Sequence, residues 1–276
     1  MTSETGAGIK YEQISFPQFN GFVQYLWRLE SHLNDTSIHS FGPLVDGCPG
    51  LIVQLGKDGS MHDENGNQLP RAFLYGQTIK LTKLYLAGKF KIIGVRFFPN
   101  VLKPLFKFNS SELTDSCVEV DALPKHKDFN LIERLCEAQS QKEQVNILSS
   151  YLSSISACND LAPDPVTQYV LNELIQSKGN ISLPKVQKAV NLSERSLERR
   201  FEQHVGVSPK LYSRICRFQA SLTQLKQSSF LKLSDIAFDN GYADQSHFIR
   251  SFREFSGYAP KEFWNYYHNS GMIAIN

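Results

Sequence analysis

Two short stretches in the C-terminal third of the chain carry arginine and other hydrogen-bonding side chains beside an apolar stripe. In the first stretch, Leu197 and Phe201 lie four residues apart, so both can face a core from one side of a helix. The side chains left near the outer face of that helix are Glu194, Arg195, Ser196, Glu198, Arg199 and Arg200. A polar, arginine-bearing face suits non-covalent contacts with an anionic partner and implies no covalent chemistry.

The second stretch repeats the first at a spacing of 51 residues. Phe248, Phe252 and Phe255 form its apolar stripe. The side chains near its outer face are Gln245, Ser246, His247, Ile249, Arg250 and Arg253. A helical unit repeated at fixed spacing indicates two similar modules that do one job twice.

Residues at the ends of both stretches predict where the two helices begin and end. Ser193 and Asp244 are N-cap residues by type, because their side chains can accept a hydrogen bond from the first helical turn. Gly206 and Gly257 can take the left-handed conformation that ends a helix. A proline follows each glycine after three residues, which suits the first position of a further helix.

A short helix is expected before each of these two helices, at Leu183–Val190 and at residues 234–239. The turns that follow contain Asn191-Leu192 and Asn240-Gly241-Tyr242. The spacing between the copies is 50 residues here, so the second turn is expected to be one residue longer. A helix, a tight turn and a second helix make a helix-turn-helix unit, whose second helix enters a major groove of DNA.

Residues 208–227 predict one long helix between the two units. The segment lacks glycine and has proline only at its start. Its apolar residues at helical spacing are Leu211, Tyr212, Ile215, Phe218, Leu222 and Leu225. Twenty helical residues reach about 30 Å, close to the ~34 Å between successive major grooves on one face of DNA. We therefore expect this helix to hold both units over consecutive grooves.

The segment from Leu233 to Arg253, with the run Arg217-Phe218-Gln219-Ala220-Ser221-Leu222, resembles the AraC/XylS family of bacterial transcription regulators. The resemblance covers about residues 163–268. It implies seven helices, in which two helix-turn-helix units flank a long connecting helix. It also implies a sequence-specific DNA-binding regulator of transcription.

The family's base-contacting positions fall on two sets of residues in this chain. They are Arg195, Ser196, Glu198 and Arg199 in the first recognition helix, and Gln245, Ser246, His247, Ile249 and Arg250 in the second. Arginine matches guanine O6 and N7, glutamine matches adenine, and a carboxylate accepts from cytosine N4. Glu198 departs from the family, whose members often carry a neutral or basic side chain there. It either accepts from cytosine or pairs with Arg195 or Arg199, and the alternative for any of these side chains is a solvated group that contacts no base.

The charge of the chain is divided between its two parts. Residues 163–276 contain 14 Lys and Arg against 10 Asp and Glu, a net charge of +4, whereas residues 1–162 contain 15 against 17, a net charge of −2. The basic part is the one with the repeat, as contact with phosphates requires. Five scattered cysteines without a C-x-x-C pair indicate neither a zinc site nor a disulfide framework. Because no apolar run reaches about 18 residues and the N-terminus lacks a signal core, we expect a cytoplasmic protein.

Residues 11–121 predict strands. Apolar runs lie at 51–55, 71–75 and 91–98, and turn residues lie at 46–47, 57–59 and 65–67. The pattern favours a β-rich barrel or double-sheet roll, followed by a short helix at 101–106. Asp46-Gly47 and the run Gly94-Val95-Arg96-Phe97 followed by Pro99 resemble the cupin-like N-terminal domain of some AraC-type regulators. That resemblance implies a domain that senses a small molecule, mediates dimerisation, or does both.

Few residues of this N-terminal part are of types that suggest a metal site, a reactive group or a ligand pocket. His32, His39 and His62 are dispersed and form no His-x-His pair, so we expect no metal site. Cys48 is either a reactive thiol or a small residue at a turn. A further set of residues either lines a pocket or serves core packing and a structural ion pair: Trp27, Arg28, Tyr75 and Arg96.

The sequence thus predicts an α+β protein with a β-rich, cupin-like barrel at 1–121, a helical hairpin and linker at 122–162, and an all-α DNA-binding domain at 163–276. The hairpin, at 128–156 with its turn near 139–144, packs on the barrel or forms a dimer interface, and the domain boundary is expected at 161–165. Expected partners are double-stranded DNA, a small-molecule effector, a second copy of the chain and RNA polymerase, with no cofactor, no metal, no catalytic residue and no membrane. The alternative is a cupin-like small-molecule binding protein or enzyme whose helical domain is an accessory.

Overall fold

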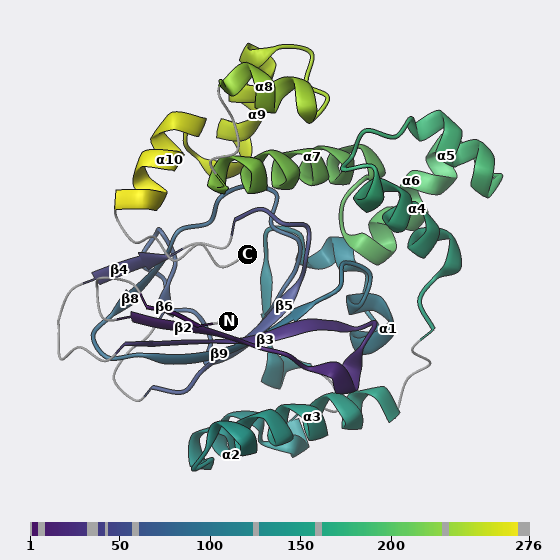
Figure 1. Cartoon of the computed structure of the whole chain (residues 1–276). Helices are drawn as coiled ribbons and strands as arrows, with labels where there is room; N and C mark the ends of the chain where they lie inside the picture. The colour runs from purple at the N-terminus through teal and green to yellow at the C-terminus, as the bar shows by residue number, and fades with distance from the viewer. Residues whose placement is uncertain are drawn as a thin grey trace.

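The computed structural model describes residues 2–4, 9–31, 38–41, 44–56, 61–123, 127–157, 162–227 and 232–269. Antiparallel sheets form the N-terminal part and helices the C-terminal part, so the predicted α+β class is confirmed (Figure 1). The predicted turn at 57–59, together with His32, Cys158 and Leu161, lies outside the described residues.

The N-terminal strands form two antiparallel sheets. The larger has the order β1 (Thr2–Glu4), β2 (Ile9–Ile14), β3 (Val23–Ser31), β9 (Lys91–Phe97), β5 (Gly50–Gln54), β7 (Ala72–Tyr75) and β10 (Cys117–Glu119). The smaller has the order β4 (Ile38–Phe41), β8 (Leu84–Ala87) and β6 (Met61–His62). The strands expected at 51–55, 71–75 and 91–98 are β5, β7 and β9. Among the described residues the two sheets are not joined by strand pairing, so their closure into one barrel stays a prediction.

Alternate residues of the central strands face opposite sides of the larger sheet. Leu51 and Val53 of β5 pack in a core shared with helices, whereas Ile52 between them packs toward the smaller sheet. This alternation follows from the two-residue period of a strand. The helices of the first core are α1 (Leu102–Phe106), α2 (Leu131–Glu137) and α3 (Gln141–Ala157). Short 3-10 turns complete this part: η1 (Pro17–Phe19), η2 (Ser110–Leu113), η3 (Val120–Ala122) and η4 (Lys127–Phe129).

The α2–α3 hairpin packs on the larger sheet, as one of the two interpretations predicted. Its turn is shorter than expected, because α3 already begins at Gln141. The Ser140 hydroxyl accepts from the backbone N–H of Glu143 at 3.2 Å, and the Glu143 carboxylate accepts from that of Gln139 at 2.8 Å. These two bonds cap the helix start. A dimer interface on the hairpin stays a prediction.

Seven helices follow in the described C-terminal ranges, the number that the resemblance implied. They are α4 (Pro165–Gln176), α5 (Leu183–Val190), α6 (Glu194–Val205), α7 (Pro209–Lys226), α8 (Leu233–Asp239), α9 (Gln245–Ser256) and α10 (Pro260–Asn269). In Figure 1, α4–α6 lie at one end of α7 and α8–α10 at the other. None of the helices within the described ranges is long and apolar enough to cross a membrane.

Each end of α7 contributes to a separate core. Leu197 and Phe201 of α6 are buried against Tyr212 near the start of α7, with Phe201 and Tyr212 ring centroids 5.8 Å apart. Phe252 of α9 packs on Phe218 further along α7, with ring centroids 5.2 Å apart. The predicted core residues of both helices are therefore confirmed, and α7 supports both units.

Candidate nucleic-acid interface

The two recognition helices, α6 and α9, begin and end in the same way. The Ser193 side chain accepts from the backbone N–H of Ser196 at 3.3 Å, and Asp244 accepts from that of His247 at 2.7 Å. Gly206 and Gly257 end the helices with φ values of 96° and 74°. The predicted caps are confirmed at all four positions, so both helices have defined first and last turns.

The turns before α6 and α9 differ in length. The first occupies residues 191–193, with Asn191 in the left-handed region at φ 52°. The second occupies residues 240–244, with Gly241 at φ 69° and Asn180 close to its Cα. The second turn is longer, as the changed spacing predicts. It exceeds the first by two residues, one more than expected.

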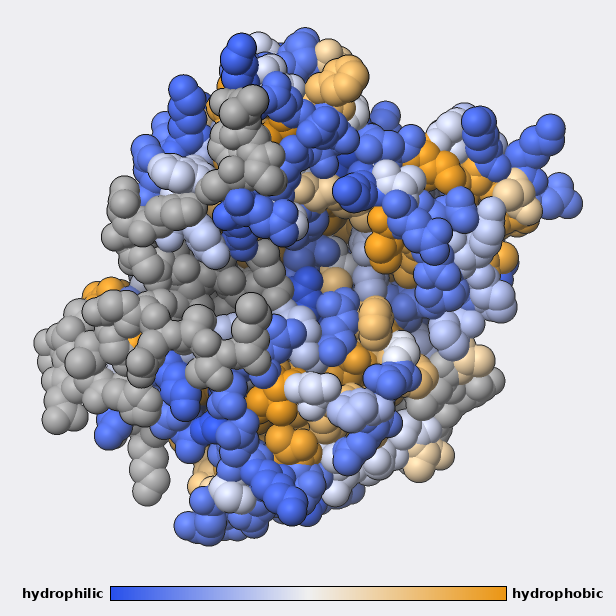
Figure 2. Space-filling model, in the orientation of Figure 1, coloured by the Kyte–Doolittle hydropathy of each residue, from blue (hydrophilic) through white to orange (hydrophobic). Residues whose placement is uncertain are grey.

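Six of the nine candidate base-contacting side chains are exposed, and three are partly engaged inside their own unit. The exposed residues are Arg195, Glu198, Arg199, Gln245, Ser246 and Arg250. The Ser196 hydroxyl accepts from that of Ser193 at 2.9 Å. His247 lies with its ring edge toward Tyr242, and Ile249 is half-buried against the core of the second unit. Hydrophilic residues cover most of the visible helical domain (Figure 2).

Among these candidate residues, Glu198 is the one that departs from the family pattern. Of the ion pairs among described residues, none joins Glu198 to Arg195 or Arg199. Its carboxylate is exposed beside two exposed guanidinium groups. The pairing alternative is therefore not realised in this structure, and the carboxylate is available to a donor outside the chain.

Arg200, which the pattern places near the outer face, has a structural role instead. Its Nε donates to the two carboxylate oxygens of Asp164 at 3.0 and 2.9 Å. Asp164 also caps α4 by accepting from the backbone N–H of Thr167 at 2.8 Å. Burial alone would raise the pKa of Asp164, but the hydrogen bonds from Arg200 and Thr167 outweigh it and bring the pKa to about 2. Sequence reasoning missed this pair because its partners are 36 residues apart with no local pattern.

The N-terminal part contains a pocket of about 370 Å³ between the two sheets. Apolar side chains from four strands line it, among them Trp27, Ile52, Phe73 and Leu84. The buried Nε1–H of Trp27 has no hydrogen-bond partner among the described residues. Tyr75 lines the same pocket, so two of the four residues named from the sequence are pocket residues.

The other two of those four residues form ion pairs. Arg28 lies 3.5 Å from Glu30 and 4.0 Å from Glu12. Arg96 pairs with Asp46, and both side chains are largely buried. Burial raises the pKa of Asp46, and Arg96 offsets part of that rise. The Arg96–Asp46 pair therefore holds the loop before β5 against the larger sheet.

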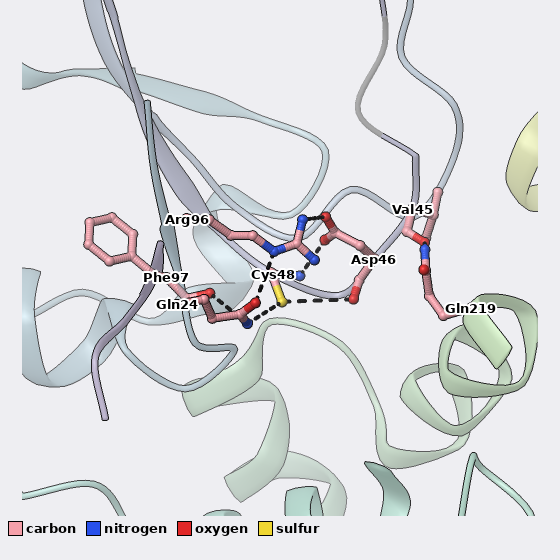
Figure 3. Close-up of polar contacts among 7 residues, drawn as sticks. All are labelled: Gln24, Val45, Asp46, Cys48, Arg96, Phe97 and Gln219. Carbon is pink, nitrogen blue, oxygen red and sulfur yellow. Dashed lines mark hydrogen bonds and ion pairs between the residues drawn. The ribbon is translucent and has the colours of Figure 1, made fainter. Parts of the chain in front are cut away.

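Cys48 belongs to the same polar cluster (Figure 3). Its Sγ accepts from Gln24 Nε2 at 3.1 Å, and its backbone N–H donates to Asp46 at 2.7 Å. Burial raises the pKa of the Cys48 thiol to about 11, which keeps it protonated at neutral pH. Because the thiolate is the reactive form, this environment favours the small residue at a turn over the reactive thiol. The structure describes no group of three or more metal-ligating side chains within its resolved ranges.

The N-terminal part contacts both helix-turn-helix units. Val45 O accepts from Gln219 Nε2 of α7 at 2.6 Å (Figure 3). Leu44 is buried in the core around α7 and α9. The Thr114 hydroxyl donates to the carbonyl of Gly206, at the end of α6, at 2.6 Å. Leu81 packs beside Gly257, at the end of α9.

Comparison with known proteins gives matches to both parts of the chain. A helix-turn-helix domain family matches residues 186–265, and a domain of unknown function (DUF6597) matches residues 16–119. The HTH-type transcriptional activator RhaS of Escherichia fergusonii is 37% identical over 71 residues, which are 26% of this chain and 25% of that protein. The XylDLEGF operon transcriptional activator of Pseudomonas putida is 30% identical over 99 residues, which are 35% of this chain and 30% of that protein.

These two matches therefore span between a quarter and a third of the relatives' own lengths. Among solved structures, ToxT from Vibrio cholerae aligns with a TM-score of 0.47 at 12% identity, covering 93% of this chain and 98% of that chain. The helix-turn-helix family match covers the segment that contains α6, α7 and α9.

Proposed function

Because this chain belongs to the AraC/XylS family of helix-turn-helix transcription regulators, we propose that it regulates transcription by placing α6 and α9 in successive major grooves of one DNA duplex. The observation that carries the proposal is the matched pair of capped helices held at the two ends of α7. The 18 residues of α7 span about 27 Å, close to the ~34 Å between successive grooves.

Within this proposal, the exposed side chains contact base edges. Arg195 and Arg199 of α6 and Arg250 of α9 present guanidinium groups that match guanine, and Gln245 presents an amide that matches adenine. Glu198 accepts from a cytosine amino group, and Ser196, Ser246, His247 and Ile249 give smaller contacts. Lysine and arginine residues at the helix ends contact phosphates and set the register on the duplex.

The pocket between the sheets is the proposed effector site of a cupin-like, incompletely closed barrel. Its volume of about 370 Å³ falls within the range of small-molecule sites. The walls are largely apolar. A small, mainly apolar molecule suits these walls.

The wall of this pocket also lies beside the ends of both recognition helices, so a ligand bound there could change the affinity for DNA. Leu81 lines the pocket and packs beside Gly257, at the end of α9. Asp115 lines it too, and the neighbouring Thr114 donates to the carbonyl that ends α6. A ligand that moves this wall would therefore act on both recognition helices. It changes DNA affinity only by binding one arrangement of the two units better than the other.

The full chain should select binding sites from duplexes of random sequence. We expect two short motifs whose centres lie about 10–10.5 base pairs apart, because the two units face successive grooves. Arg199→Ala should relax one motif and Arg250→Ala the other. No enrichment, or a single motif indifferent to both substitutions, would contradict the proposal. Self-association and contact with RNA polymerase stay predictions.

A further inference from the structure

A second pocket, of about 380 Å³, lies between the two helix-turn-helix units. Its walls come from the start of α5, one side of α7, and the turn before α9 with the first turns of that helix, where Tyr242 and His247 contribute. The loop before α5 also approaches both neighbours, with Gly179 against Ser213 of α7 and Asn180 against Gly241. The pocket therefore lies where the two units meet, and we call it the seam pocket.

Basic residues dominate the charge of this seam pocket. Lys210, Arg214 and Arg217 line it from α7, at a spacing that places them on one side of the helix. No aspartate or glutamate is among its lining residues, all of which the structure describes. The pocket between the N-terminal sheets differs, because Asp63, Glu64 and Asp115 share its lining with a single lysine.

One buried donor in the seam pocket lacks a partner. The Nε of Arg217 has no hydrogen-bond partner among the described residues. Arg214 differs, because it pairs with Glu254 and stacks over the ring of Phe255 at 5.1 Å. Buried polar groups are nearly always satisfied, so the unpaired Nε of Arg217 in a basic pocket points to an anion as its partner.

The start of α5 also favours an anion in this pocket. Its N-cap residue, Ser182, makes no side-chain capping bond, whereas Ser193, Ser208 and Asp244 each cap their helices. The helix dipole places partial positive charge at this end of α5. Three basic side chains, an unpaired guanidinium Nε and a helix start therefore meet at one pocket.

We infer that the seam pocket binds a phosphate, and that this phosphate belongs to the DNA backbone between the two grooves entered by α6 and α9. The inference rests on the proposed function for the source of the phosphate, since the geometry of the pocket equally suits a free phosphate ion. The bound group sets the register of both recognition helices at once, because α5, α7 and the start of α9 all contribute to its walls. It carries no base preference.

The first test compares Arg217→Gln and Lys210→Gln with Lys142→Gln, which removes one exposed positive charge from α3 in the N-terminal part. Binding of the full chain is measured against salt concentration on a selected duplex and on an unrelated duplex of equal length. We expect each pocket variant to bind both duplexes about tenfold more weakly. The slope of log K against log salt should fall by about 0.9 for each lost phosphate contact. Lys142→Gln should match the unmodified protein.

The outcomes separate this inference from the proposed function. The phosphate site is overturned if the pocket variants melt like the unmodified protein and their slopes of log K against log salt are unchanged. It is also overturned if they lose affinity for the selected duplex only. Lys210 is exposed, so Lys210→Gln keeps the test decisive if Arg217→Gln fails to fold. If the unmodified protein binds neither duplex, the proposed function fails, and the free-ion measurement alone decides on the pocket.

That measurement follows thermal melting in inorganic phosphate against chloride of equal ionic strength. Phosphate-dependent stabilisation that Arg217→Gln abolishes, found together with unchanged salt slopes on both duplexes, assigns the pocket to a free ion and overturns the backbone assignment. The backbone assignment instead predicts an effect of replacing single phosphates between the two motifs by neutral methylphosphonates. One methylphosphonate position should weaken the unmodified protein about tenfold and leave Arg217→Gln unaffected. The backbone assignment is overturned if no methylphosphonate position has this effect.

Discussion

The α5–α6 unit and the α8–α9 unit share their caps and their terminal glycines, yet they are held to the N-terminal part in different ways. At the end of α6, the carbonyls of His204 and Gly206 accept from the hydroxyls of Ser110 and Thr114 at 2.8 and 2.6 Å. At the end of α9, Gly257 meets the apolar side chain of Leu81. Hydrogen bonds require a defined direction, whereas apolar contact tolerates sliding. The end of α6 is therefore the more firmly positioned of these two helix ends.

The cores of the two units differ as well. The first contains mainly aliphatic side chains around Phe201 and Tyr212. The second is an aromatic cluster in which Phe252 contacts Phe218, Phe248 and Phe263 at ring-centroid distances of 5.2, 5.7 and 5.6 Å. The repeat in the sequence thus specifies where a large apolar residue is needed, while the neighbours of that residue differ between the copies.

The largest expected effect comes from emptying equivalent core positions. Phe201→Ala and Phe252→Ala should each lower the free energy of unfolding by about 3–5 kcal/mol, because both side chains are fully buried. Urea unfolding of the full chain measures the loss. Hydrogen exchange should show it mainly in α5–α6 for Phe201→Ala and in α8–α9 for Phe252→Ala. Native-like melting of either variant, or loss of protection in both units alike, would contradict two separate cores.

Local chemistry explains which of these features the sequence could predict. A cap such as Ser193 and a helix end such as Gly206 depend on residues a few positions away, and both were predicted correctly. The Asp164–Arg200 and Asp46–Arg96 pairs depend on approaches that only the folded chain creates. Arg200 was therefore placed among solvent-facing residues, although the sequence did allow a structural ion pair for Arg96. The seam pocket combines side chains from three helices, and no spacing in the sequence predicts it.

The next largest effect concerns DNA affinity and compares one exposed arginine from each unit. Arg199→Ala and Arg250→Ala should each weaken specific binding by about 1–3 kcal/mol with the fold intact, because each removes a guanidinium contact to a base. Competition against a selected duplex and its single-base variants measures the change. Each substitution should relax preference in its own motif only. Unchanged affinity in one variant would remove that residue from the base-contacting set.

A smaller effect tests the ion pair between Asp164 and Arg200 of the first unit. Asp164→Asn should lower stability by about 1–2 kcal/mol at neutral pH, because a cap and a charge-assisted bond to Arg200 are weakened. The folded-state pKa of Asp164 is about 2, below the unfolded value near 4. Its stabilisation is therefore present above pH ~4 and lost as the pH falls toward ~2. Urea unfolding of both proteins between pH 7 and 2 should show the difference shrink there, and a constant difference would contradict this account.

The smallest effect addresses the polar contact at the end of α6 directly. Thr114→Val keeps the side-chain shape and removes the bond to the Gly206 carbonyl, at an expected cost of about 1 kcal/mol. Thr223→Val is the matched control, because the Thr223 hydroxyl donates within α7, to Gln219 O at 2.9 Å. Hydrogen exchange should increase at the last turn of α6 in Thr114→Val and stay unchanged at the last turn of α9. Equal loosening of both helix ends would contradict the account in which only the end of α6 depends on this hydrogen bond.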